Sequence, residues 1–380
     1  MTTYAPLDLQ RPRERRWDLL LIGAALAAGV LGLVMVYTAT SSGLAVLGLT
    51  GSYFLKRQAV FLVLSIVAML FIMRLDYRRY ESFAYGIYGL VVLSLLAVMS
   101  PIGSSSLGAS RWFALGPLRI QPSEFAVLGM ILVTATIGAR NPEGLSWRTV
   151  GLILGLTSLP AGLILVQPDM GTAIILLIST LAMLLALGVP VRFVLGLVAL
   201  GILAMYLAVQ IGFLHHYQVM RLTSFLHQNT TDPQMQQYVY NVNQAKAAIG
   251  SGGLFGSGIG QGSQTNLGYV PEQQTDFIFT AVGEQLGFFG ATAVLALLAL
   301  VASRILRAAF VARDQVGRVI CVGVFTFFGF SVFENAGMTM GIMPVTGIPL
   351  PFFSYGGSAL LCFFMAIGIV VNVFARRNGA

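Results

Sequence analysis

The sequence predicts an all-α integral membrane protein with about ten transmembrane helices. Of its 380 residues, 57% are hydrophobic and 9% are charged, whereas soluble domains carry roughly 25% charged residues. These few charges are not enough to solvate a globular protein of this size, and the apolar runs are long enough to cross a bilayer. We therefore expect a single polytopic membrane domain over residues 1–380.

Ten apolar runs have the length of transmembrane helices, because about 20 helical residues cross the hydrocarbon layer of a bilayer. The first run is too long for a cleavable signal peptide and lacks a small-residue cleavage site, so we expect it to remain as the first span. The ten predicted spans are residues 19–37, 54–73, 83–99, 122–137, 150–166, 171–189, 193–213, 276–302, 319–333 and 358–374.

The distribution of Arg and Lys predicts the orientation, because cytoplasmic loops carry the excess of positive charge. Of these 22 residues, 16 fall in the two ends of the chain and in alternate loops. We therefore expect a cytoplasmic N-terminal segment, 1–17, and a cytoplasmic tail, 375–380. This topology explains the net charge of +8, which does not indicate binding to nucleic acid.

The longest connection, residues 214–275, is predicted to lie on the outer face between the seventh and eighth spans. Its first half is rich in Gln and Asn, and its second half contains a Gly-rich stretch, 250–262. Connections of this length are usually functional or disordered. The glycines match no nucleotide-binding motif. They either form a flexible hinge or free backbone amides to bind a pyrophosphate.

Acidic residues near the outer ends of the spans are candidates for chemistry, because a carboxylate at a membrane is costly unless it is paired or hydrated. Asp276 begins the eighth span. It acts either as a helix cap or as a carboxylate held where a lipid substrate meets outside water. Glu284 follows two helical turns later on roughly the same face, so we expect both side chains to line one cavity.

Four further residues have both a structural and a functional interpretation. Glu124 follows Pro122 in the first turn of a helix, where both residue types are common. Asp169 lies in a tight turn, for which Asp is an ordinary residue. Arg111 and Lys246 lie on the sparsely charged outer side, where each either binds an anionic head group or anchors the chain at the interface.

The apolar stretch 343–358 is interrupted by three prolines and three glycines, so it cannot be a regular helix. Non-helical backbone at membrane depth is tolerated only where it is buried in protein or lines a wet cavity. We therefore expect this stretch, which includes Ser354, to form one wall of a site.

Six motifs follow one another along most of the chain. They are Arg111-Trp112, Gln121-Pro-Ser-Glu124, Gln167-Pro-Asp-Met-Gly-Thr172, Ala248-Ile-Gly-Ser-Gly-Gly253, Pro271-Glu-Gln-Gln-Thr-Asp-Phe-Ile-Phe279 with Gly283-Glu284, and Pro349-Leu-Pro-Phe-Phe-Ser-Tyr-Gly-Gly357. Together they resemble the SEDS family, the RodA/FtsW/SpoVE proteins of bacterial cell-wall synthesis. The sequences around Val270 and Ile348 are more similar to RodA than to FtsW.

The resemblance implies a peptidoglycan glycosyltransferase of the bacterial cytoplasmic membrane. Such an enzyme polymerises lipid II on the outer face by an inverting displacement, here in cell elongation and shape. The implied partner is a class B penicillin-binding protein, which cross-links the strands. The resemblance places the essential carboxylate, which we expect to be the catalytic base, at Asp276 and cavity acids at Glu124, Asp169 and Glu284. We expect Arg111, Lys246, Thr275 and Ser354 to line the same cavity.

Three positions lack a cation that the family commonly carries: Gln274, Val127 and Ser257. Stabilisation of the pyrophosphate must then come from elsewhere. No cofactor is firmly implied. The remaining candidates are Arg111, Arg221, Lys246 and a divalent metal ion such as Mg²⁺ or Mn²⁺.

Two other functions remain as alternatives: a lipid II flippase or transporter, and a non-catalytic scaffold of the cell-wall machinery. Transporters also combine many spans with Pro/Gly interruptions and intramembrane acids. However, the motifs cluster on the outer side, and no inverted repeat is visible. These two observations favour the enzyme.

Overall fold

The computed structural model describes residues 17–46, 50–101, 103–106, 109–116, 118–141, 143–212, 216–230 and 232–377. In this part of the chain each predicted span coincides with a helix, and nine of the helices are long and apolar enough to cross a membrane. The tenth, α6, is apolar and has 17 residues, at the short end of the range for a span. The ten helices are α1 (Leu19–Val46), α2 (Tyr53–Arg74), α3 (Arg79–Val98), α4 (Pro122–Ala139), α5 (Trp147–Val166), α6 (Met170–Ala186), α7 (Val191–Gln210), α11 (Ile278–Val311), α12 (Gln315–Thr339) and α13 (Gly357–Ala375).

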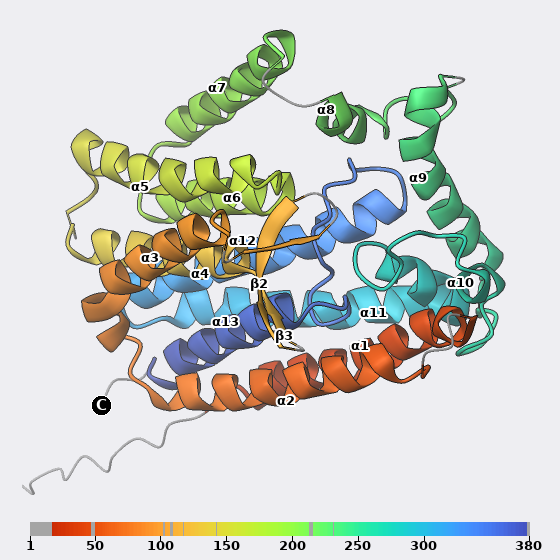
Figure 1. The fold of residues 1–380 in the computed structure, drawn as a ribbon. Coiled ribbons are helices and arrows are strands. Elements are labelled where there is room, and N and C mark those ends of the chain that lie inside the picture. Colours follow the sequence, from red (N-terminus) through yellow and green to blue (C-terminus); the bar gives the residue numbers. More distant parts are fainter. Residues whose placement is uncertain are drawn as a thin grey trace, which may run out of the picture.

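The centre of the bundle is formed by α4, α12 and α13, which are the most buried of the spans. Helices α1 and α2 pack beside α13, whereas α5 and α6 lie on the other side of α4 and α12 (Figure 1). Helix α7 lies at the edge of the bundle, with Val194 as its one buried residue. A helix that is apolar on all sides and barely packed is consistent with lipid as its solvent. The cytoplasmic position of the two ends stays a prediction.

A small three-stranded antiparallel sheet, which was not predicted from the sequence, precedes α4. Its strands are β1 (Ser104–Ser106), β2 (Ala109–Leu115) and β3 (Leu118–Ile120), in the order β1-β2-β3. The sheet is joined to α13 at Gln121, whose backbone N–H donates to Oγ of Ser358 at 2.9 Å. The all-α prediction therefore holds for the spans but not for this connection.

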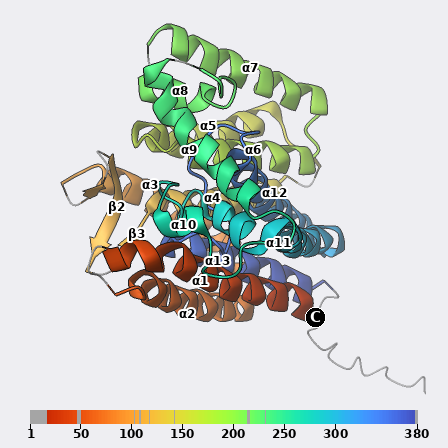
Figure 2. The same cartoon turned by 90° about the vertical axis from the view of Figure 1, so that its right-hand side faces the viewer.

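The connection between α7 and α11 contains three helices that were also not predicted from the sequence. They are α8 (His216–Thr223), α9 (Pro233–Ser251) and α10 (Ser263–Leu267). Helix α9 leads from α8 towards the first half of α11, and α10 lies between α11 and α1 (Figure 2). The outer location of this connection stays a prediction.

The Gly-rich stretch is folded against α11, so neither a flexible hinge nor an open pyrophosphate cradle describes it. Helix α11 is kinked at Gly287, where φ is +66° and ψ is −166°. A Cβ at Gly287 would lie 2.2 Å from the backbone nitrogen of Gly256, so only glycine permits this approach. The amides of Ser257 and Gly258 are already used, because they donate to carbonyl oxygens of α11 at 2.9 and 3.1 Å.

Candidate functional site

Asp276 lies directly before α11 and is held there by a side chain of α12. Nδ2 of Asn335 donates to the carbonyl oxygen of Asp276 at 2.9 Å and to that of Ile348 at 2.7 Å. Asn335 is fully buried, whereas Asp276 is partly exposed. The backbone of Asp276 is therefore fixed from inside the bundle.

The Pro-rich stretch packs against the turn that carries Asp276. Oγ of Ser354 donates to the carbonyl oxygen of Thr275 at 2.6 Å and accepts from the N–H of Leu350 at 2.8 Å. The N–H of Tyr355 donates to the carbonyl oxygen of Gln274 at 2.7 Å. Thr275 and Ser354 therefore support the backbone of the site.

Arg221, on α8, meets Asp276 across Gly347. A Cβ at Gly347 would lie 3.2 Å from Oδ2 of Asp276 and 3.4 Å from a terminal guanidinium nitrogen of Arg221, and φ there is +81°. Nε of Arg221 donates to the carbonyl oxygen of Val345 at 3.0 Å, which fixes the guanidinium in this position. A cation is thus placed beside the carboxylate by residues far apart in the chain.

The residues around Asp276 change the pKa of its carboxyl group. Burial raises the pKa of Asp276 to about 6, and the charges of Glu272 and Asp169 act in the same direction, whereas Arg221 and Arg111 oppose them. A carboxylate with this pKa is ionised at neutral pH and is a stronger proton acceptor than an ordinary Asp. These properties suit a general base.

A second buried acid, Glu334, lies on α12 near Asp276 and Arg221, whose charges act on it. One oxygen, Oε1, accepts a hydrogen bond from Oγ1 of Thr346. The other, Oε2, is buried and has no hydrogen-bond partner among the described residues. Glu334 was not among the site residues predicted from the sequence.

The side chain of Asp169 caps α6 and accepts hydrogen bonds from hydroxyl and amide groups. Its Oδ1 accepts from the N–H of Thr172 at 3.3 Å, and its Oδ2 accepts from Oγ of Ser123 at 2.9 Å and Nε2 of Gln121 at 3.0 Å. The buried side chain of Glu124 lies within the electrostatic reach of Asp169. Glu124 lies in the first turn of α4 and Asp169 in the turn before α6, as their structural interpretations predicted, and the two acids also lie close together.

Arg111 extends from β2 to the turn before α6. Its Nε donates to the carbonyl oxygen of Gln167 and a terminal nitrogen donates to that of Pro168, both at 2.6 Å. Because the charges of Arg111 and Asp169 both act on Asp276, the structure brings three predicted site residues into one electrostatic cluster. In this structure Arg111 binds the protein backbone.

Glu284 does not share a cavity with Asp276, contrary to the expectation from helical spacing. Its side chain is 1% exposed. One oxygen accepts from the N–H of Gln264 at 2.7 Å, and the other accepts from the N–H and Oγ1 of Thr265 at 2.9 and 2.6 Å. Helical spacing does not relate the two side chains, because Asp276 precedes the helix. Residues of α10 bind the Glu284 carboxylate instead.

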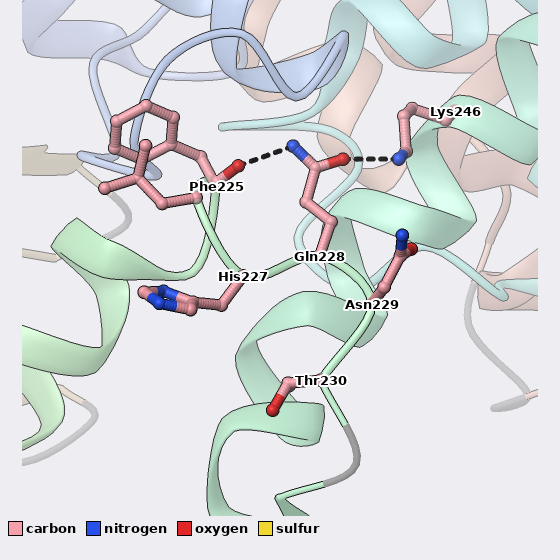
Figure 3. A pocket seen from close by; sticks show the side chains of 7 residues that line it. Phe225, His227, Gln228, Asn229, Thr230 and Lys246 are labelled. Atoms are coloured by element: carbon pink, nitrogen blue, oxygen red, sulfur yellow. Dashed lines mark hydrogen bonds between the residues drawn. The ribbon is translucent and has the colours of Figure 1, made fainter.

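Lys246, on α9, is hydrogen-bonded to the turn that follows α8. Its Nζ donates to Oε1 of Gln228 at 2.5 Å, and both line an open hollow with His227, Asn229 and other residues between α8 and α9 (Figure 3). Among the described residues no hydrogen bond or ion pair joins Lys246 to Asp276, so its role in the cavity stays a prediction.

Two of the residues that complete the site are hard to recognise in the sequence. Arg221 was only one of several candidate cations, because two helices of the long connection, α9 and α10, separate it from Asp276. Asn335 gave a weak signal, as a polar residue in an apolar span, where such residues are often functional. Its partners could not be deduced without the fold.

Replacing Asn335 with Leu is expected to lower turnover by roughly 10- to 100-fold, because small shifts of a catalytic group can cost about 10²-fold. The change leaves the carbonyl oxygens of Asp276 and Ile348 without their donor. The measurement is the rate of glycan polymerisation, the reaction that the sequence resemblance implies, by the purified variant. Ser331→Ala is the matched control, since its hydroxyl bonds only within α12, to Phe327. Equal rates for Asn335→Leu and wild type would contradict the positioning role.

The divalent metal suggested by the sequence has no ligand set of its own in the described residues. No group of three or more His, Cys, Asp or Glu side chains there has a metal-binding arrangement. Participation of Mg²⁺ or Mn²⁺ therefore stays a prediction.

Comparisons with known proteins agree with this architecture. The FtsW/RodA/SpoVE family model, described as "Cell cycle protein", matches residues 18–379. The chain is 35% identical to the FtsW protein of Trichlorobacter lovleyi, named a probable peptidoglycan glycosyltransferase, over 97% of this chain and 96% of that protein. It is 37% identical to the peptidoglycan glycosyltransferase MrdB of Escherichia coli K12, over 85% and 86% of the two chains.

Solved structures also match over almost the full length. One is a chain of a peptidoglycan synthase complex that coordinates polymerization and crosslinking, with a TM-score of 0.79, 30% identity, and coverage of 96% of this chain and 99% of that one. Another is the rod shape determining protein RodA of Thermus thermophilus, with a TM-score of 0.71, 30% identity, and coverage of 96% and 98%. This multi-pass membrane protein therefore belongs to the FtsW/RodA/SpoVE family, as the motifs around Asp276 indicated.

Proposed function

We propose that this chain is a peptidoglycan glycosyltransferase that polymerises lipid II into glycan strands on the outer face of the bacterial cytoplasmic membrane. The observation that carries the proposal is an aspartate, Asp276, whose backbone is fixed at the head of a membrane helix and whose carboxylate lies beside Arg221. The glycosyltransferase names of the relatives support the same reaction.

In the proposed reaction, a sugar hydroxyl of one lipid-linked glycan attacks the anomeric carbon of another. Asp276 accepts the hydroxyl proton as the new C–O bond forms. The bond from the anomeric carbon to the lipid pyrophosphate breaks, and its electron pair leaves on the phosphate oxygen. The positive charges of Arg221 and Arg111 near Asp276 favour this developing negative charge. A single displacement inverts the anomeric configuration without a covalent enzyme intermediate.

The direct test is polymerisation of lipid II by the purified protein, resolved as glycan strands on a gel. We expect strands from the chain itself and increased synthesis when a class B penicillin-binding protein is added as partner. Parallel reactions with Mg²⁺, Mn²⁺ or a chelator test the metal prediction. Movement of labelled lipid II across vesicles without polymer would instead favour the flippase alternative and would overturn the proposal.

The cellular role that we propose is elongation and maintenance of cell shape, which rests on the RodA-like motif versions. Relatives with FtsW and MrdB names both match the chain. Depletion separates the two roles: loss of elongation makes rod-shaped cells round, whereas loss of division makes them filamentous. Filaments would assign the chain to division.

The rate is expected to fall below about pH 6, tenfold for each further pH unit. The base must be deprotonated, and the pKa of Asp276 is raised to about 6, so protonation removes the active form at a higher pH than for an ordinary Asp, whose pKa is about 3.9. The measurement is polymerisation rate at saturating lipid II between pH 4.5 and 8. A flat profile down to about pH 4.5 would contradict a raised pKa in the working enzyme.

A further inference from the structure

The Gly-rich segment forms one rigid unit with the kinked part of α11. Gly287 interrupts α11, and the backbone of the segment takes over hydrogen bonds that the helix would otherwise make. Gly256 closes a turn within the segment, its N–H donating to the carbonyl oxygen of Gly252 at 2.8 Å. The four backbone bonds between segment and helix run from Ser257 N to Glu284 O, Gly258 N to Gln285 O, Phe288 N to Gly253 O and Phe289 N to Leu254 O.

Five large apolar side chains project outward from this unit. Leu254, Phe255 and Ile259 of the segment are 59%, 80% and 61% exposed, and Phe288 and Phe289 of α11 are 60% and 56% exposed. We call them the Phe255 patch. The rings of Phe255 and Phe289 lie 5.4 Å apart, so the patch is continuous with the outward surface of the spanning helix. A cluster of this size is unfavourable in water.

The depth of Phe289 can be deduced from α11 itself. Arg304 of α11 pairs with Asp18, directly before α1, at 2.8 Å. We take this ion pair as one boundary of the membrane, because charged side chains are costly inside the hydrocarbon layer. Phe289 precedes Arg304 by about 15 residues, which is about 22 Å of helix at about 1.5 Å per residue. The hydrocarbon layer is about 30 Å thick. Phe289, and Phe255 beside it, therefore fall within that layer, in the leaflet opposite Arg304.

The sequence of the segment agrees with this depth, because no charged residue occurs between Lys246 and Glu272. Irregular backbone at membrane depth requires partners for its polar groups. Helix α11 supplies several of them, through its carbonyl oxygens and through Oε1 of Gln285, which accepts from the N–H of Gly260 at 2.9 Å.

We propose that the segment 252–260 is embedded in the outer leaflet and that the Phe255 patch binds lipid acyl chains. It is thus a membrane-inserted part of the long connection, rather than a loop in outside water. Lipid is favoured over a protein partner because the patch continues the surface of a spanning helix and carries no charge. The inference does not depend on the proposed enzymatic activity.

The test uses a nitroxide spin label at Phe255→Cys or Ile259→Cys in the full chain, reconstituted in phosphatidylethanolamine/phosphatidylglycerol vesicles. The native Cys321 and Cys362 are fully buried, so labelling is selective. Collision rates with oxygen, which concentrates in lipid, and with a water-soluble nickel chelate report the surroundings. Val67→Cys, at a 58% exposed position of α2, is the lipid reference. The exposed Asn229→Cys, between α8 and α9, is the water reference.

We expect the oxygen-to-nickel ratio at both reporter positions to match Val67→Cys and to exceed Asn229→Cys several-fold. Nickel collisions as frequent as at Asn229→Cys would place the segment in water and overturn the proposal. Low collision rates with both reagents would show that protein covers the patch, which would also overturn it. The two reporter positions guard against misfolding of one variant, and neither readout requires polymerisation activity.

Discussion

Asp276→Asn is expected to abolish lipid II polymerisation, with a loss of about 10²–10⁴-fold, the usual contribution of a general base. The amide keeps the size of the side chain but cannot accept the hydroxyl proton. The backbone bond from Asn335 to Asp276 is unaffected, because it uses the carbonyl oxygen. The measurement is single-turnover polymerisation by purified variants, with lipid II binding measured separately.

The Asn variant is expected to remain folded. The pKa of Asp276 is raised in the folded state, so the fold binds the proton more tightly than the unfolded chain does. The ionised carboxylate therefore lowers stability as pH rises from about 4 through about 6, and the amide removes this cost. Glu272→Gln is the matched control, an exposed neighbouring acid whose loss should shift only the pH profile. Wild-type turnover by Asp276→Asn would remove the residue from the base role.

Glu284→Ala is expected to destabilise the protein by on the order of 3 kcal/mol or more, because hydrogen bonds to a charged group contribute roughly 1.5–3 kcal/mol each. The substitution leaves the N–H groups of Gln264 and Thr265 without their buried acceptor. The attachment of α10 to α11 is then lost. The measurement is the thermal unfolding midpoint in detergent, together with protease resistance of the connection between α7 and α11.

The conservative variant distinguishes structure from chemistry at this position. Glu284→Gln keeps one acceptor oxygen, so we expect an intermediate unfolding midpoint and activity that follows the folded fraction. A Glu284→Gln protein with the wild-type midpoint but no polymerisation would contradict the structural assignment. It would favour the role in the cavity that the family resemblance implies.

The ten spans could be predicted because few backbone conformations are stable inside a membrane. In hydrocarbon every backbone N–H and C=O needs an internal partner, so long apolar runs become helices whatever their neighbours are. Asp276 could be identified as a candidate because placing a carboxylate at the start of a span has a high cost in free energy, so such residues are usually functional. The surrounding motif assigned it a chemical role. Neither inference required knowledge of how the helices pack.

The arrangement around Asp276 could not be predicted in the same way. The position of Arg221 depends on the path of α8, and the partners of Asn335 depend on how α12 meets the Pro-rich stretch. Glu284 illustrates the limit most clearly: spacing along one helix suggested a shared cavity with Asp276. Asp276 precedes the helix, and the packing of α10 gave the Glu284 carboxylate different partners.

The sequence alone thus determined that this is a membrane protein, where its spanning helices run and which carboxylate to test, because these properties depend on local hydrophobicity and charge. Only the tertiary structure decided which cation faces Asp276, which acid supports the fold, and how the Gly-rich segment completes a broken helix. Those contacts join residues far apart in the chain, and their energies depend on the burial and geometry that arise when the bundle forms.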